Sequence, residues 1–132
     1  PMRGIRVLLP RAQGARETLV DGLVERGAVV DELKLYVAAI PERPDAEGLR
    51  RLRAGEIDIA TFASSSSVRN LVAMLGGDPG PLRSVAIAAI GPSTAEAVRE
   101  FGLEVAIEPR QHTIDALVQA IADAFVAASA GA

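Results

Sequence analysis

The strict alternation of two kinds of segment is the sequence feature that most constrains the fold. Short runs rich in β-branched and aliphatic residues are each followed by a stretch whose apolar residues recur every three or four positions, as on one face of an amphipathic helix. The runs that predict strands are residues 5–9, 28–36, 57–63, 84–90 and 104–109. Five strands alternating with five helices over short connections predict an α/β domain, because each pair of parallel strands needs a helical crossover.

The polarity of each run indicates its place in the sheet. Residues 57–63 and 84–90 are almost continuously apolar, as expected of strands covered on both faces, whereas residues 28–36 alternate Leu with Glu and Lys and fit an edge strand. Right-handed crossovers then favour a three-layer α/β/α domain with a five-stranded parallel sheet in the flavodoxin-like order 2-1-3-4-5. We expect a single domain over residues 1–132, frayed at residues 1–4 and 127–132.

Charge and residue content exclude several classes of function. The 14 basic and 17 acidic residues give a net charge of -3 without a long run of either sign, so we expect no nucleic-acid partner. The longest apolar run is too short to span a bilayer, so we expect no membrane association. Without cysteines the sequence shows no sign of a secreted compartment, so we expect a cytoplasmic protein. The chain has no cysteine, no visible metal-ligand set and no nucleotide-binding glycine motif after its first strand, so we expect neither a metal nor a cofactor.

Hydroxyl side chains gather where the predicted strands end. The run Ser64–Ser67 follows the third strand, Gly91–Thr94 the fourth, and Thr113 the fifth. Ligands of open α/β sheets bind at the carboxyl ends of the strands, and helix N-termini bearing hydroxyls suit an anion such as a carboxylate or phosphate. Each hydroxyl taken alone is better explained as a helix N-cap than as a ligand contact.

The other polar residues at this edge also have simple structural interpretations. Ser93 and Glu96 have the spacing of a capping box, and Asp45 has the position of a cap for the second helix. Tyr36, at a strand end, is interpreted as a half-buried packing residue, and His112, the only histidine, as a loop residue without a catalytic partner.

The order of four motifs adds a resemblance to a known family. The motifs are LLPRAQGARETLVDGLVERGAVVDELKLY, IDIATFASSSSVRNL, AIGPSTAEAVREFGLEV and HTIDALVQAI. In this order they resemble the C-terminal half of uroporphyrinogen-III synthase, the haem-pathway enzyme that closes a linear tetrapyrrole. The resemblance runs from Ile5 to Phe125, and its most specific part is IGPSTAEA behind a serine-rich turn.

The resemblance implies an arrangement of domains. The family's enzyme is about twice this length, with two flavodoxin-like domains and an active site in the cleft between them. The first strand-helix-strand of each sequence half packs with the remainder of the other half. The crossing point matches VAAIPERP, residues 37–44.

The resemblance also implies a cofactor-free lyase. Hydroxymethylbilane loses its hydroxyl, the substituted carbon of the last pyrrole attacks the cation to give a spiro intermediate, and the ring closes with that pyrrole inverted. By position, Tyr36 matches the tyrosine thought to assist loss of the hydroxyl. The serine turn with Ser64, Ser65 and Ser66, and the turn with Ser93 and Thr94, match substrate-binding positions for the carboxylates.

Three readings of the whole chain stay open at this point. The favoured one is a monomeric half of a uroporphyrinogen-III synthase that closes on itself and is inactive alone. The second is a domain-swapped homodimer in which two copies exchange residues 5–36 and rebuild the two-domain enzyme. The third is a non-catalytic module, natural or engineered, that keeps the fold without the site.

Overall fold

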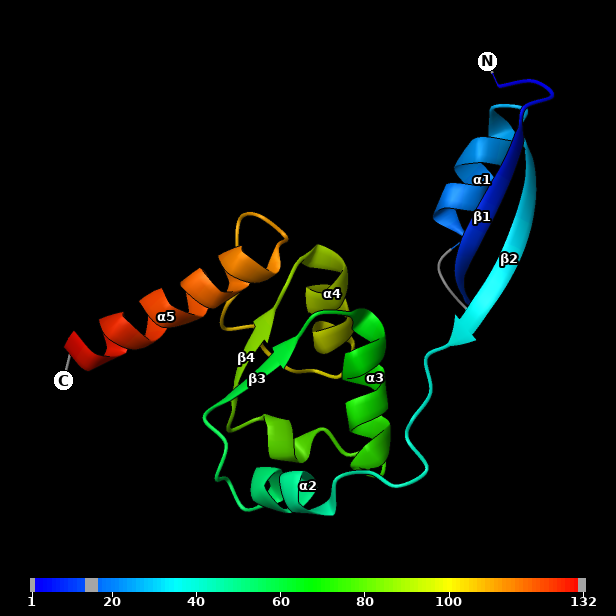
Figure 1. Ribbon diagram of the computed structural model, residues 1–132. Helices are drawn as coiled ribbons and strands as arrows, with labels where there is room; N and C mark the ends of the chain where they lie inside the picture. Colours follow the sequence, from blue (N-terminus) through cyan, green and yellow to red (C-terminus); the bar gives the residue numbers. More distant parts are fainter. Residues whose placement is uncertain (1, 14–16, 131–132) are drawn as a thin grey trace. The chain divides into compact units, whose positions relative to one another are not determined.

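The computed structural model describes residues 2–13 and 17–130, with side chains described up to residue 127. The chain divides into two compact units, Pro1–Ala39 and Ile40–Ala132, and each is described by itself (Figure 1). The predicted place of Ala15 on the first helix, and the predicted fraying of residues 1, 131 and 132, lie outside the described residues.

Unit one is a single βαβ motif. It consists of β1 (Arg6–Gln13), α1 (Thr18–Glu25) and β2 (Val29–Val37), and the two strands pair in parallel. Gly27 makes the turn from α1 into β2 with a φ of 88°, and a Cβ at this position would come within 3.2 Å of the Arg3 Cα. Glycine is therefore required there for both conformation and space.

Unit one buries very little of its own apolar surface. Ala28 is the one hydrophobic residue buried among its described residues, at 7% exposed. Large side chains on both strands stay open, with Leu8 64% and Leu35 59% exposed. A unit of this size has too small a core to be stable by itself, because folding must offset the conformational entropy of every ordered residue.

Unit two contains the remaining elements of the chain. These are α2 (Ala46–Arg53), β3 (Ile59–Phe62), α3 (Ser65–Met74), the 3₁₀ turn Gly80–Leu82, β4 (Ala86–Ala89), α4 (Pro92–Glu100) and α5 (Ile114–Ala130). The strands β3 and β4 pair in parallel, from Ile59 opposite Ala86 to Phe62 opposite Ala89. No helix in the described part of the chain, α5 included, is both long and apolar enough to cross a bilayer.

The two faces of β4 hold separate hydrophobic clusters. Ile87 belongs to the larger cluster with Val72 of α3 and Val98 of α4, whereas Ala88 packs with Leu117 of α5. Because successive residues of a strand point to opposite faces, α3 and α4 cover one face of β3–β4 and α5 covers the other (Figure 1). Unit two therefore has the layered α/β arrangement that the sequence predicts.

The structure has two two-stranded parallel sheets where one five-stranded sheet in the order 2-1-3-4-5 was predicted. The predicted fifth strand, residues 104–109, is reduced to one parallel bridge between Ala88 and Ile107. Its backbone bonds only around that bridge, with the N–H groups of Ala106 and Ile107 both donating to the Ile87 carbonyl. Pro109 has no N–H to extend the ladder beyond this bridge.

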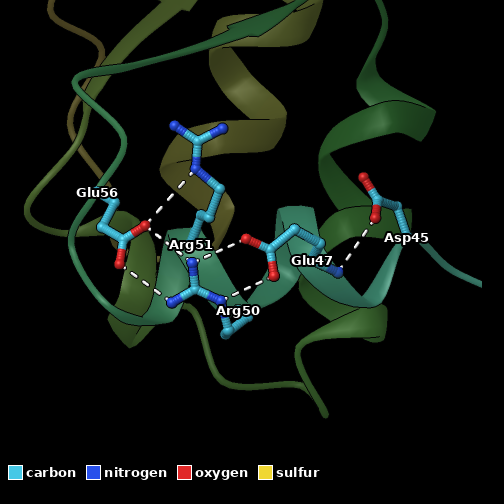
Figure 2. A network of polar contacts seen from close by, with 5 residues as sticks. All are labelled: Asp45, Glu47, Arg50, Arg51 and Glu56. Carbon is cyan, nitrogen blue, oxygen red and sulfur yellow. Dashed lines mark hydrogen bonds and ion pairs between the residues drawn. The ribbon is translucent and has the colours of Figure 1, made fainter.

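A network of charged side chains ties α2 to the segment that precedes β3 (Figure 2). The Arg50 guanidinium donates to Glu47 at 2.8 and 2.9 Å and to Glu56 at 3.0 and 3.1 Å. Arg51 Nε lies 3.6 Å from Glu56. Asp45 caps the helix as predicted, accepting from the Glu47 N–H at 3.1 Å. The hydrogen bond from Arg50 lowers the pKa of the Glu47 carboxyl.

Replacing Glu47 by Gln is expected to lower stability slightly at neutral pH, because the network is solvent-exposed and screened. A carboxyl whose pKa is lower in the folded than in the unfolded protein stabilises the fold at pH values above its unfolded pKa. This stabilisation is lost as the pH falls through the folded pKa. The urea midpoints of the parent and E47Q should therefore differ at pH 7 and converge once the pH has fallen below the folded-state pKa of Glu47. A difference that persists unchanged at low pH would contradict this role of the ion pair.

Candidate functional site

Three helix starts meet at one edge of unit two. Ser64 follows the end of β3 by two residues, and Gly91 follows the end of β4 by two residues. The Ile90 N–H donates to the Phe62 carbonyl at 3.0 Å, which holds the two strand ends side by side. The segment before α5 joins them, because the His112 ring lies against Gly91. This carboxyl edge is where ligands of parallel α/β sheets bind.

The serine turn uses its hydroxyls unequally. Ser64 is the N-cap of α3: its Oγ accepts from the Ser67 N–H at 3.2 Å, and Ser67 Oγ donates to the Ser64 carbonyl at 2.6 Å. Ser66 Oγ lies 3.1 Å from Ser64 Oγ. The Ser65 side chain makes no hydrogen bond within the described residues. Capping therefore accounts for Ser64, whereas Ser65 and Ser66 keep hydrogen-bonding capacity for a ligand.

The turn after β4 begins its helix earlier than predicted. The capping box of Ser93 and Glu96 is wrong: Gly91 is the N-cap of α4, without a side-chain cap, and Pro92 occupies the first turn. Proline is favoured at the first helical position, where no N–H is needed. Ser93 is exposed at the edge, whereas Thr94 is buried, at 4% exposed. Of this predicted pair, Ser93 has the more accessible hydroxyl.

His112, which the sequence predicts to be a loop residue, has a specific neighbour in the structure. A Cβ on Gly91 would come within 3.0 Å of both Cγ and Cδ2 of the imidazole, so the ring occupies the space that this glycine leaves open. The next residue, Thr113, caps α5 as predicted, its Oγ1 accepting from the Ala116 N–H at 3.2 Å. The sequence signal for this contact was the glycine directly after a buried strand, which is typical of close approach.

The electrostatics of the edge favour an anion. Neither α3 nor α4 carries an acidic residue in its first turn, so the partial positive charge of these two N-termini is not compensated there. The first turn of α5 does contain one, Asp115. Within residues 2–13 and 17–130, no three His, Asp or Glu side chains form a group that could hold a metal ion. The arrangement can supply hydroxyls and helix N-termini to carboxylates.

Tyr36 belongs to unit one, near the end of β2. The β1–β2 register shifts between Arg11 and Ala12, so that Lys34 pairs with Arg11, Tyr36 pairs with Ala12, and Leu35 is an extra residue. This bulge places Tyr36 on the sheet face opposite Lys34, although residues two apart normally share a face. The Tyr36 side chain is 63% exposed. The predicted serines and Thr94 lie at the edge of unit two, whereas Tyr36 lies in unit one.

A charged cluster that the sequence analysis missed lies at the same end of β1. The Arg11 guanidinium lies 2.5 Å from Glu17 and 2.6 Å from Glu32, and its side chain is only 11% exposed. The hydrogen bond to Glu17 is the main cause that raises the pKa of Arg11. The cluster joins β1, β2 and the residue before α1. The cluster forms only when β1 and β2 pair, so no local sequence pattern predicts it.

Replacing Ser64 by Ala should destabilise unit two by about 1 kcal/mol, because α3 loses its N-cap. The matched control is Ser65→Ala, which removes the same hydroxyl one residue later and is expected to leave stability within about 0.5 kcal/mol. Urea unfolding of both variants measures the difference. Equal losses for the two serines would contradict the assignment of Ser64 as the cap.

Replacing Gly91 by Ala should displace the His112 ring, because the new methyl group enters its space. We expect a loss of about 1 kcal/mol, within the range of overpacked sites. The same change in a His112→Ala background should cost less, and the double-mutant cycle should show a coupling of at least about 0.5 kcal/mol. Strictly additive losses would mean that the ring and the glycine do not interact.

Comparisons with known proteins agree with one another. Residues 2–119 match the family described as uroporphyrinogen-III synthase HemD. The chain is 33% identical over 127 residues to a uroporphyrinogen-III synthase of Synechococcus elongatus, covering 92% of this chain and 48% of the relative. It is 34% identical to a putative uroporphyrinogen-III synthase of Methanothermobacter thermautotrophicus, covering 92% of this chain and 50% of that relative.

A solved structure gives the same result. The crystal structure of uroporphyrinogen III synthase from Thermus thermophilus matches 96% of this chain and 52% of its own, with a TM-score of 0.58 and 28% identity. This chain thus spans about half the length of the relatives it matches. The family match covers most of the sequence, and so the chain belongs to the uroporphyrinogen-III synthase family.

Proposed function

We propose that this chain supplies one wall of the cleft in which a uroporphyrinogen-III synthase closes hydroxymethylbilane. The observation that carries the proposal is the family match over residues 2–119 together with the hydroxyl-bearing helix starts at one edge of unit two. The substrate bears many acetate and propionate carboxylates, and such an edge is suited to them because it offers hydroxyl donors and uncompensated helix N-termini.

The proposed reaction requires little acid-base catalysis by the protein. The hydroxyl of the linear tetrapyrrole leaves as water once it is protonated, and the phenol of Tyr36 is the proposed hydrogen-bond donor to it. The substituted carbon of the last pyrrole attacks the resulting cation, and the spiro intermediate reopens and closes with this pyrrole inverted. Positioning the two ends of the substrate next to each other accounts for most of the rate enhancement, since it lowers the entropic part of the activation barrier.

In this proposal the hydroxyl edge binds the carboxylates of the substrate, and Tyr36 assists the departure of the substrate hydroxyl. Ser65 and Ser66 offer hydroxyls beside the N-terminus of α3, and Ser93 offers an exposed hydroxyl at the N-terminus of α4. Thr94 is buried and acts by holding the first turn of α4. We infer that one wall is insufficient for turnover, because the chain spans about half the length of its relatives.

The test is the isomer composition of the product from hydroxymethylbilane over a wide range of protein concentration. We expect no inverted macrocycle at high dilution and its appearance where two copies can meet. Tyr36→Phe should lower the rate of its formation about 10²-fold, because the departing hydroxyl loses its hydrogen-bond donor. Glu47→Gln, in the exposed ion-pair network of α2 and not among the proposed substrate-binding residues, is the control and should retain the parent rate.

Two outcomes would overturn this proposal. A specific activity that stays constant down to the highest dilution would show that one copy is a complete catalyst. An absence of inverted product at every concentration would remove the catalytic role and favour a non-catalytic module of the same family.

A further inference from the structure

A cavity lies at the amino end of β4, the end opposite the hydroxyl edge. Its volume is about 280 Å³, and all of its lining residues belong to unit two, so its shape follows from packing inside that unit. Four apolar side chains line it, each no more than 7% exposed: Leu82, Val85, Ile87 and Leu103. These four belong to the larger hydrophobic cluster, so the interior of the cavity is apolar.

The cavity exists because the segment that follows α4 joins β4 late. Gly102 ends the helix with a φ of 67°, a left-handed conformation that favours glycine. The segment first bonds to β4 at Ala106 and Ile107, whose N–H groups donate to the Ile87 carbonyl. Glu104, which precedes them, makes no backbone hydrogen bond within the described residues. The missing rungs of the ladder leave a space beside the start of β4 that side chains fill only in part.

Two exposed side chains of opposite charge, Arg83 and Glu104, stand on the rim of this cavity. Nη1 of Arg83 donates to the Gly102 carbonyl at 3.2 Å, which holds the guanidinium in place. Its other donors make no hydrogen bond in the part of the chain that the structure describes. Glu104 forms neither an ion pair nor a hydrogen bond there. A cation and an anion that line one cavity without pairing with each other leave both charges for a ligand.

An apolar interior below two opposite charges suits a small zwitterion with an apolar body. A guanidinium binds a carboxylate through paired N–H donors, and a carboxylate accepts from an ammonium group. With about 30 Å³ for each water in the liquid, the cavity has the volume of roughly nine waters. The ligand is therefore a small one, the size of an aliphatic amino acid.

We propose that this cavity binds a free α-amino acid with an aliphatic side chain. In this arrangement the ligand carboxylate pairs with Arg83, its ammonium group pairs with Glu104, and its side chain enters the apolar interior. A ligand with only one of the two charges would face the like charge of the rim without compensation. The site lies at the end of β4 opposite the hydroxyl edge, so the inference goes beyond the proposed function and does not rest on it.

The first measurement is a titration of the isotope-labelled full chain with L-leucine, followed through its backbone amide resonances by NMR. We expect saturable shifts centred on Arg83, Leu103 and Glu104. The Kd should be on the order of 1 mM, because one aliphatic side chain is buried and exposed charge pairs contribute little. An absence of saturable shifts at concentrations well above this Kd would overturn the proposal.

Three analogues of leucine test the three proposed contacts one at a time. Isocaproate lacks the ammonium group and isoamylamine lacks the carboxylate, so each should bind about threefold or more weakly than leucine. Glycine keeps both charges without the aliphatic body and should bind about tenfold or more weakly. Binding of isocaproate or isoamylamine as tight as that of leucine would overturn the zwitterion, and equally tight binding of glycine would overturn the apolar interior as part of the site.

Two variants assign the charges of the ligand to residues. Glu104→Gln and Arg83→Gln should each raise the Kd for leucine about threefold or more. Because E104Q removes the like charge that isocaproate faces, its affinity for isocaproate should match or exceed that of the parent. The same holds for isoamylamine in R83Q. These two readouts require a folded cavity, so a variant that merely unfolds does not reproduce them.

Matched controls carry the same charge changes outside the cavity. Glu42→Gln and Arg53→Gln alter exposed side chains that do not line it, and both should leave the Kd for leucine unchanged. A Kd for leucine that is unchanged in E104Q or R83Q, or that rises equally in the controls, would overturn the proposed site.

Discussion

Parallel strand pairing is the constraint on which the rest of this structure depends. Parallel sheets are stable when both faces are covered, because their helical crossovers and apolar strands leave no face suited to water. Unit two meets this condition: Ile87 and Ala88, adjacent on β4, are 1% and 0% exposed and belong to clusters on opposite faces. Unit one meets it only in part, since α1 covers a single face of β1–β2.

The same pairing creates the candidate site. Because β3 and β4 run in parallel and in register, their carboxyl ends release two chain segments at one edge, each entering a helix at once. Local capping and ligand binding therefore draw on the same residue types. The serine turn shows how one short run divides these tasks: the Ser64 hydroxyl caps the helix, while the Ser65 side chain makes no hydrogen bond within the described part of the chain.

Residue patterns within single segments predicted the strands and helix caps that those segments form. The buried strands β3 and β4 and the caps Asp45 and Thr113 follow from apolar runs and from residue types that bond their own backbone. The capping box at Ser93 failed because Pro92 competes for the start of the same helix. The fifth strand is reduced to a bridge because Pro109 has no N–H for the ladder, so the segment pairs with β4 only around Ile107. Contacts such as His112 with Gly91, and Arg11 with Glu32, depend on pairing between distant segments, which spacing alone does not encode.

The candidate functional residues are divided between the two units. The hydroxyl edge belongs to unit two, and Tyr36 belongs to unit one, at the end of a strand whose bulge sets the direction of its side chain. The position of Tyr36 therefore depends on strand pairing within unit one, and the positions of the hydroxyls depend on the helix starts of unit two.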